Sequence, residues 1–108
     1  MNTVNRERWA SLSLAEQMAN IGSEVGRSAK WLTKNKPDLA EGAFNRATEL
    51  MDLTLDYGRQ GSPGRDALLK ELGMARLYYT ESYQRGDQDS LSYLEKYFCQ
   101  FAAIFRPR

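Results

Sequence analysis

Apolar residues recur every three to four positions along most of the chain, and no run alternates strictly between apolar and polar residues. A spacing near 3.6 residues is typical of helices, and the chain has only two Val and two Ile, which strands favour. Proline and glycine interrupt the pattern in three places. The pattern therefore predicts an all-α protein with helices over about 13–34, 37–57, 63–85 and 90–105.

The first of these helices carries the cleanest amphipathic pattern. Ser13 is its expected N-cap, and Glu16 completes a capping box. Gly22 and Gly26 lie beside the apolar face, where each costs about 1 kcal/mol relative to alanine. We expect them to mark close packing, either against a neighbouring helix of the same chain or against a partner. The expected core positions of this helix are Leu14, Met18, Ile21, Val25, Ala29 and Leu32.

The other helices also have apolar core faces. Leu72 and Tyr79 are central to the face expected for the helix over 63–85, and Leu94 and Phe98 to that of the helix over 90–105. Short connections between helices imply antiparallel neighbours. We therefore expect one domain, residues 1–108, folded as an up-down-up-down four-helix bundle. The core face expected for the helix over 37–57 comprises Leu39, Ala43, Ala47, Leu50 and Thr54.

Three helices carry more apolar residues than one core face needs. Aromatic residues and methionine are frequent among this excess, as they are in protein interfaces. Scattered exposed apolar residues are normal, so the excess alone does not require a partner. We interpret it as a protein–protein interface, most simply that of a homo-oligomer. The predicted interface residues are Phe44, Met51, Leu55, Leu77, Tyr78, Tyr93, Tyr97 and Ile104.

Composition argues against an enzyme. Histidine is absent, which removes the most usual general base and a common metal ligand. Cys99 is the single cysteine, next to an apolar face, where we expect a buried, unreactive thiol. No glycine-rich phosphate loop is present. We expect no catalytic residue, no cofactor and no metal site, and we interpret the acidic edge of the helix over 37–57 as a solvated face.

Charge and hydropathy constrain the partners and the compartment. Fifteen basic and fourteen acidic residues give a net charge of +1, which does not favour bulk electrostatic binding of nucleic acid or membrane. The N-terminus has no apolar signal segment and no apolar run reaches the ~20 residues of a membrane span. A lone cysteine fits a reducing compartment. We therefore expect a cytoplasmic protein that does not enter membranes.

Charge is nevertheless unevenly divided. Residues 1–36 contain six basic and three acidic residues, whereas residues 37–61 contain two and five. We expect this difference to be used in pairing between adjacent helices. The basic end of the first helix is a second candidate site, because cations interleaved with an aromatic ring can bind a nucleic-acid backbone and stack a base. The alternative is a solvated helix end with Trp31 packed under Arg27. The residues of this patch are Arg27, Lys30, Trp31 and Lys34.

Three segments carry a resemblance to known proteins: SLAEQMANIGSEVGRSAKW, RATELMDLTL and SYLEKYFCQFAAIF. They resemble small uncharacterised bacterial four-helix-bundle proteins. More faintly, the chain is similar to bundle proteins encoded in insertions of large-subunit ribosomal RNA genes and to the accessory protein of diversity-generating retroelements. The latter two imply a ring-like homo-oligomer, and the accessory protein implies a basic surface for nucleic acid and a reverse transcriptase. This chain departs from that accessory protein in being nearly neutral.

Two hypotheses follow. The first is a non-enzymatic, self-associating helical-bundle protein that acts in interaction or as a scaffold. The second is a nucleic-acid-binding accessory protein that works through the basic end of the first helix.

Overall fold

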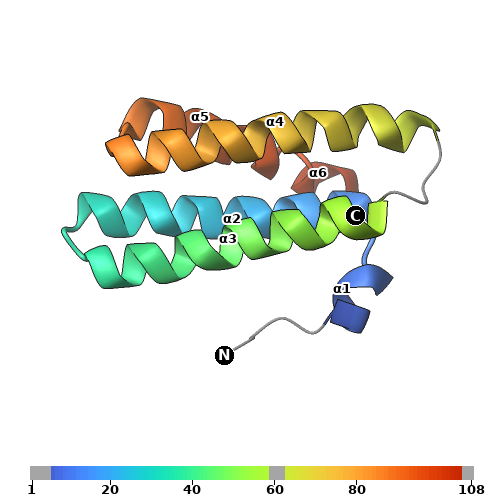
Figure 1. Cartoon of the computed structure of the whole chain (residues 1–108), viewed down its shortest axis with the longest axis horizontal. Coiled ribbons are helices and arrows are strands. Elements are labelled where there is room, and N and C mark those ends of the chain that lie inside the picture. The colour runs from blue at the N-terminus through green and yellow to red at the C-terminus, as the bar shows by residue number, and fades with distance from the viewer. Residues whose placement is uncertain (1–5, 59–62, 106–108) are drawn as a thin grey trace.

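A computed structural model describes residues 6–58 and 63–105, and every secondary-structure element in these ranges is a helix (Figure 1). The structure is therefore all-α, as predicted. Four of the helices are long, and two short ones flank them. The helices are α1 (Arg6–Ser11), α2 (Leu14–Thr33), α3 (Pro37–Gly58), α4 (Pro63–Arg85), α5 (Gln88–Cys99) and α6 (Ala102–Phe105).

The sequence signals at the helix ends act as expected. Ser13 Oγ accepts a hydrogen bond from the Glu16 backbone N–H at 3.1 Å, and Glu16 Oε1 accepts one from the Ser13 N–H at 2.9 Å. This reciprocal capping box fixes the start of α2. Asn35 and Gly86 adopt left-handed backbone conformations, with φ of 61° and 65°, just beyond the ends of α2 and α4. Such residues satisfy the last carbonyls of a helix and turn the chain.

Consecutive long helices run in alternate directions (Figure 1). Helix α2 contacts α3 and α5, and α4 contacts the same two helices. Each long helix therefore has two long neighbours, and α5 lies between α2 and α4. Among the described residues, no helix is long and apolar enough to cross a membrane.

The prediction for the C-terminal helix is wrong in one respect. We expected one helix over 90–105, whereas α5 ends at Cys99, a turn covers Gln100 and Phe101, and α6 follows. Helix α6 contacts both α2 and α5. The break lets the end of the chain fold back on α2 instead of continuing beyond it. A periodic sequence does not reveal such a bend, because the spacing of apolar residues barely changes across it.

Helix α1 was not predicted, and it is anchored by Trp9. This side chain is buried, and its Nε1–H donates to Thr54 Oγ1 on α3 at 3.0 Å. The Trp9 carbonyl in turn accepts from Gln17 Nε2 at 2.8 Å. Both polar partners are themselves buried, so the contacts satisfy groups that would otherwise be costly inside the protein.

The core contains most of the expected residues, and the departures on α3 include Leu39 and Met51. Leu39 is half exposed, because it lies in the first turn of α3, at the end of the helix nearest the connection from α2. Met51 is completely buried, because α3 packs against α1, α2 and α4 and so buries a wide arc. The buried side chains common to prediction and structure include Met18, Ile21, Val25, Ala43, Ala47, Leu50, Thr54, Leu72, Tyr79, Leu94 and Phe98.

Ion pairs between helices differ from the expectation. The pair between α2 and α3 joins Glu24 to Arg46, with 3.3 Å between Oε1 and Nε. Here the acid lies on the more basic segment and the base on the more acidic one, so segment charge did not predict the pair. Helices α3 and α4 are joined by Asp52 and Arg76, with 2.7 Å between Oδ1 and Nε.

Candidate functional site

The strongest candidate site is an apolar face on α4 and α5. Met74 is 73% exposed, Leu77 68%, Tyr93 64% and Tyr78 39%. We call these four residues the α4–α5 apolar face. Large apolar side chains this exposed lose the stabilisation of burial, and a cluster of them indicates a contact surface more strongly than single residues do.

A shallow groove of about 420 Å³ runs between the two helices at this face. Two of its tyrosine hydroxyls already have partners: Tyr97 donates to Glu71 Oε1 at 2.7 Å, and Tyr78 donates to Ser90 Oγ at 2.9 Å. These bonds hold the rings in place. The groove is lined by Glu71, Met74, Ala75, Tyr78, Tyr93, Leu94 and Tyr97.

Tyr97 is part-buried at this groove. Desolvation by burial, and secondarily the hydrogen bond to the Glu71 carboxylate, raise the pKa of the Tyr97 hydroxyl above its ordinary value. The hydroxyl therefore stays protonated and donating, and it provides no base for catalysis. The groove is lined mainly by apolar and aromatic side chains, and its Glu71 carboxylate accepts a hydrogen bond from the Tyr97 hydroxyl.

The structure brings together three of the eight predicted interface residues at this groove, Tyr78, Tyr93 and Tyr97. A fourth, Leu77, is exposed on α4 but does not line the groove. Met74 was not among the predicted interface residues, although it is the most exposed of the large apolar residues in the described chain. Its position one turn before Tyr78 on the same helix was the signal that could have identified it.

The remaining predicted interface residues do not join this face. Met51 is completely buried, so its assignment to an interface is wrong. Phe44 is part-buried and stacks on Tyr83 with 4.3 Å between ring centroids, which makes it part of the packing between α3 and α4. Leu55 is part-buried against the core. The side chain of Ile104 lies outside those the structure describes.

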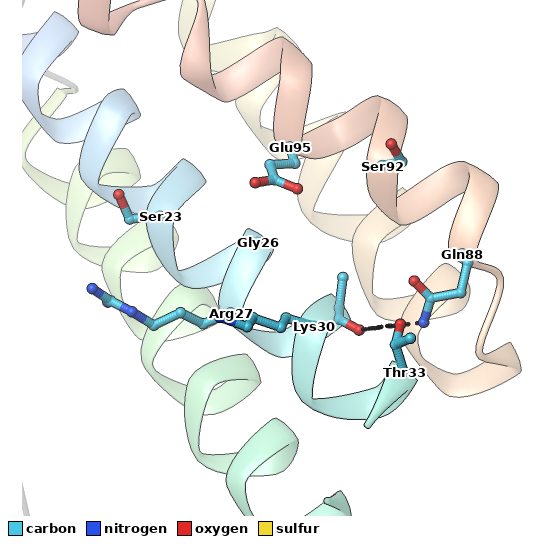
Figure 2. A pocket seen from close by; sticks show the side chains of 9 residues that line it. Ser23, Gly26, Arg27, Lys30, Thr33, Gln88, Ser92 and Glu95 are labelled. Atoms are coloured by element: carbon cyan, nitrogen blue, oxygen red, sulfur yellow. Dashed lines mark hydrogen bonds between the residues drawn. The ribbon is translucent and has the colours of Figure 1, made fainter. Parts of the chain in front are cut away.

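A second candidate is a polar cleft of about 510 Å³ between α2 and α5, shown in Figure 2. Gln88 Nε2 donates to the Ala29 carbonyl across one end of it at 3.4 Å (Figure 2). Arg27 and Lys30 come from α2, and Glu95 faces them from α5. The cleft is lined by Ser23, Gly26, Arg27, Ala29, Lys30, Thr33, Gln88, Ser92 and Glu95.

The predicted basic patch is divided by this arrangement. Arg27 and Lys30 line the cleft, whereas Trp31 and Lys34 do not. Arg27 pairs with Glu24 at 2.9 Å between Nη1 and Oε2. The cation that lies over Trp31 is Lys34, with Nζ 5.9 Å from the ring centroid. A cation at this distance interacts favourably with an aromatic face.

Gly22 and Gly26 pack within the chain, at the crossing of α2 and α5. A methyl group added at Gly22 would lie 2.7 Å from Phe98 Cβ and 3.3 Å from the Cys99 backbone nitrogen. One added at Gly26 would meet the Glu95 carboxylate, at 2.5 Å. The first of the two alternatives open for these glycines is therefore the one observed.

Two other places in the chain hold side chains that could react: the Ser28–Tyr79 hydroxyl pair and Cys99. The Ser28 and Tyr79 hydroxyls are buried and 2.6 Å apart, and burial raises the pKa of Tyr79. Cys99 is exposed, so the expected burial of its thiol is wrong, but partial desolvation and the nearby Glu95 carboxylate raise its pKa. A raised thiol pKa lowers the fraction of reactive thiolate. Across the described ranges, no group of three or more acidic or cysteine side chains could hold a metal ion.

In comparisons with known proteins, no protein-family model, curated protein or solved structure matches this chain.

Proposed function

We propose that this protein is a non-enzymatic, cytoplasmic interaction or scaffold protein that associates with itself through the α4–α5 apolar face. In this proposal the four long helices form an antiparallel up-down-up-down bundle, which presents α4 and α5 as a rigid surface. The observation that carries the proposal is the exposure of Met74, Leu77, Tyr78 and Tyr93 on neighbouring helices.

The composition of the face supports a protein partner. Tyrosine and methionine are enriched at interfaces, and tyrosine can bury a large ring while losing little conformational freedom. The Tyr78 and Tyr97 hydroxyls are already hydrogen-bonded within the chain, so covering their rings leaves no new unpaired polar group. Burial of apolar surface contributes about 25 cal/mol per Å², which favours a partner that covers the whole face.

A matched pair of variants tests this proposal. Leu77→Lys places a charge on the face, whereas Leu39→Lys makes the same change at a half-exposed leucine on α3. We expect the mass of the wild type in sedimentation velocity to rise with concentration above the 12.4 kDa of one chain. Leu77→Lys should abolish this rise and Leu39→Lys should keep it. A wild type that stays monomeric up to millimolar concentration would contradict the proposal.

A second candidate function is nucleic-acid binding by an accessory protein. The observation that favours it is Lys34 over the half-buried Trp31 ring, on the same helix as Arg27 and exposed Lys30. A cation beside an aromatic platform suits a single-stranded backbone and its bases. Against it, Arg27 is already paired with Glu24.

This second function has its own test. Binding of a fluorescent single-stranded RNA at about 50 mM salt should weaken as salt rises, because displaced counterions drive such binding. Lys30→Glu with Lys34→Glu should then remove it, while Arg85→Glu with Lys96→Glu, at exposed positions on α4 and α5, serves as the charge-matched control. Absence of binding at low salt, or equal loss in both double variants, would reject the patch.

A further inference from the structure

The side of α4 that faces solvent carries a regular stripe of exposed residues. Its residues are separated alternately by three and four positions, which is the spacing of the contact positions in a coiled coil. All six are exposed, and they lie on the side of α4 away from its buried Leu72 and Tyr79. We call this the α4 outer stripe: Ala67, Lys70, Met74, Leu77, Glu81 and Gln84.

The stripe is complementary to the same stripe on a second, antiparallel copy of the chain. If a second α4 is laid against it antiparallel, with the two-fold axis between residues 75 and 76, Met74 faces the partner's Leu77. In the same alignment Lys70 faces the partner's Glu81, and Ala67 faces the partner's Gln84. Two-fold symmetry repeats each contact, so the middle of the seam is apolar and an opposite-charge pair lies on either side of it.

Neighbouring registers lose this match. Shifting the partner by seven residues in one direction places Lys70 against the partner's Met74, and shifting it in the other places Leu77 against the partner's Glu81. Either shift sets a charged group against an apolar one. The charge then loses its hydration and gains no opposite charge, which is unfavourable. The positions of the charges therefore select one alignment.

The charged residues of the stripe are available for such a contact. Neither Lys70 nor Glu81 forms an ion pair or hydrogen bond with another described residue, whereas Arg76, on the side of α4 facing α3, is held by Asp52. Gly73 lies beside the stripe, and a methyl group added there would meet no atom within 4 Å. This small residue leaves room for a second helix to approach.

We propose that two copies of this chain pair through the α4 outer stripe, antiparallel, about a two-fold axis between residues 75 and 76. This inference rests on the proposed function, because it specifies the partner and register of the same α4–α5 surface. Tyr78 lies on the flank of the stripe that faces α5, and a two-fold axis brings the partner's Tyr78 to that same flank. The groove tyrosines of both copies then border the seam.

The size of the seam sets the strength of the contact. The stripe spans about 27 Å of helix, and with a helix width near 10 Å it is smaller than the roughly 800 Å² per partner of a standard interface. We therefore expect a dimer with a Kd of about 1 to 100 µM, which forms and dissociates within an ordinary concentration series.

Charge reversal tests the register. Lys70→Glu sets a carboxylate against the partner's Glu81, and Glu81→Lys sets an ammonium group against the partner's Lys70, so two like-charge pairs form per dimer in either variant. We expect each single variant to dimerise about tenfold more weakly than wild type at low ionic strength. The double variant should regain wild-type affinity, because both pairs become opposite in charge again. In an equimolar mixture of the two single variants, both charge pairs of the mixed dimer are opposite in sign, so the mixture should associate about as tightly as wild type.

The recovery of affinity in the double variant cannot come from contact between the two changed residues within one chain. Lys70 and Glu81 are eleven positions apart, about 16 Å along α4, which is too far for direct contact. The control Lys96→Glu changes the charge on α5 by the same amount as Lys70→Glu, outside the stripe, and should leave dimerisation within about twofold of wild type. Helical circular dichroism of every variant should match wild type, since all three positions are exposed.

The outcomes separate the two proposals. If wild type does not associate at any concentration, both the self-association and this register fail. If wild type associates but the double variant is no tighter than the single variants, the register is overturned while self-association stands. A limiting mass larger than two chains, as in a closed ring, also overturns the two-fold pairing.

Discussion

Helix α5 has two long neighbours, and it packs against them in opposite ways. Toward α2, Phe98 is completely buried, and Gly22 lets its Cβ approach the α2 backbone. Toward α4, Tyr93 remains 64% exposed beside an apolar groove. Each side carries an aromatic residue of α5, so composition does not distinguish them.

The difference separates a side of α5 that is packed within the chain from a side that stays exposed. A glycine on the neighbouring helix permits backbone contact, which buries an aromatic ring within the chain. On the other side, the hydroxyls of Tyr97 and Tyr78 hydrogen-bond to Glu71 and Ser90 and hold their rings at the surface. The α2 side should therefore govern unfolding, and the α4 side should govern association.

The largest expected effect is that of truncating Phe98. Phe98→Ala should lower the free energy of unfolding by about 3–5 kcal/mol, because it leaves a cavity at the α2–α5 crossing. Tyr93→Ala, the matched change on the exposed side, should lower it by less than about 1 kcal/mol. Urea unfolding of both variants, at concentrations where the wild type is monomeric, measures the difference. Equal losses would remove the distinction between the two sides.

The next largest effect separates the two glycines of α2. Gly22→Ala should destabilise the protein by about 1–2 kcal/mol, since overpacking against Phe98 and the Cys99 backbone outweighs the gain in helix propensity. At Gly26 the added methyl meets the far end of the flexible Glu95 side chain, which can move away. Gly26→Ala should therefore be neutral or stabilising by up to about 1 kcal/mol. Thermal unfolding of the pair would contradict this close packing if Gly22→Ala were the more stable variant.

Alkaline pH should weaken the core through Tyr79. Burial raises the pKa of this hydroxyl in the folded protein above its ordinary value of 10.0, so the folded chain keeps a proton that the unfolded chain loses. The contribution of this group to stability is thus unchanged below about pH 10 and falls above it, by at most about 1.4 kcal/mol per pH unit.

The test for Tyr79 is the slope of stability against pH. Tyr79→Phe should make the fall between about pH 10 and 11 shallower than in wild type, while Ser28 keeps its hydrogen bond to the Val25 carbonyl. Tyr83 and Tyr97, whose pKa values burial also raises, contribute in the same direction and remain in the variant. An unchanged slope would show that Tyr79 ionises alike in both states.

The smallest expected effect concerns the thiol at the end of α5. Partial desolvation, with a further contribution from the Glu95 carboxylate, raises the pKa of Cys99. Glu95→Gln removes the smaller of these two causes, so the pKa should fall part of the way toward its ordinary value. Alkylation of Cys99 at about pH 8 should then be modestly faster than in wild type, because more of the thiol is ionised. An unchanged rate, measured with iodoacetamide, would exclude an influence of Glu95.

Local signals predicted the long helices well, but not which apolar residues would remain exposed. Met51 and Leu77 both lie outside the predicted core faces, yet Met51 is buried and Leu77 is 68% exposed. Helix α3 has neighbours on several sides, whereas the outer stripe of α4 is exposed along its length. The number of neighbours around a helix depends on the arrangement of all of them, which periodicity in one segment does not contain.

The sequence by itself determined the helical nature of the chain, the capping box at Ser13 and the places where α2, α3 and α4 begin and end. These depend on residues within a few positions of one another, so their physics is local. Only the tertiary structure decided that Gly22 receives Phe98, that Trp9 reaches Thr54, and that Tyr78 and Tyr93 meet at one groove. Those contacts join residues far apart in the chain, and they form only when the helices have taken their places together.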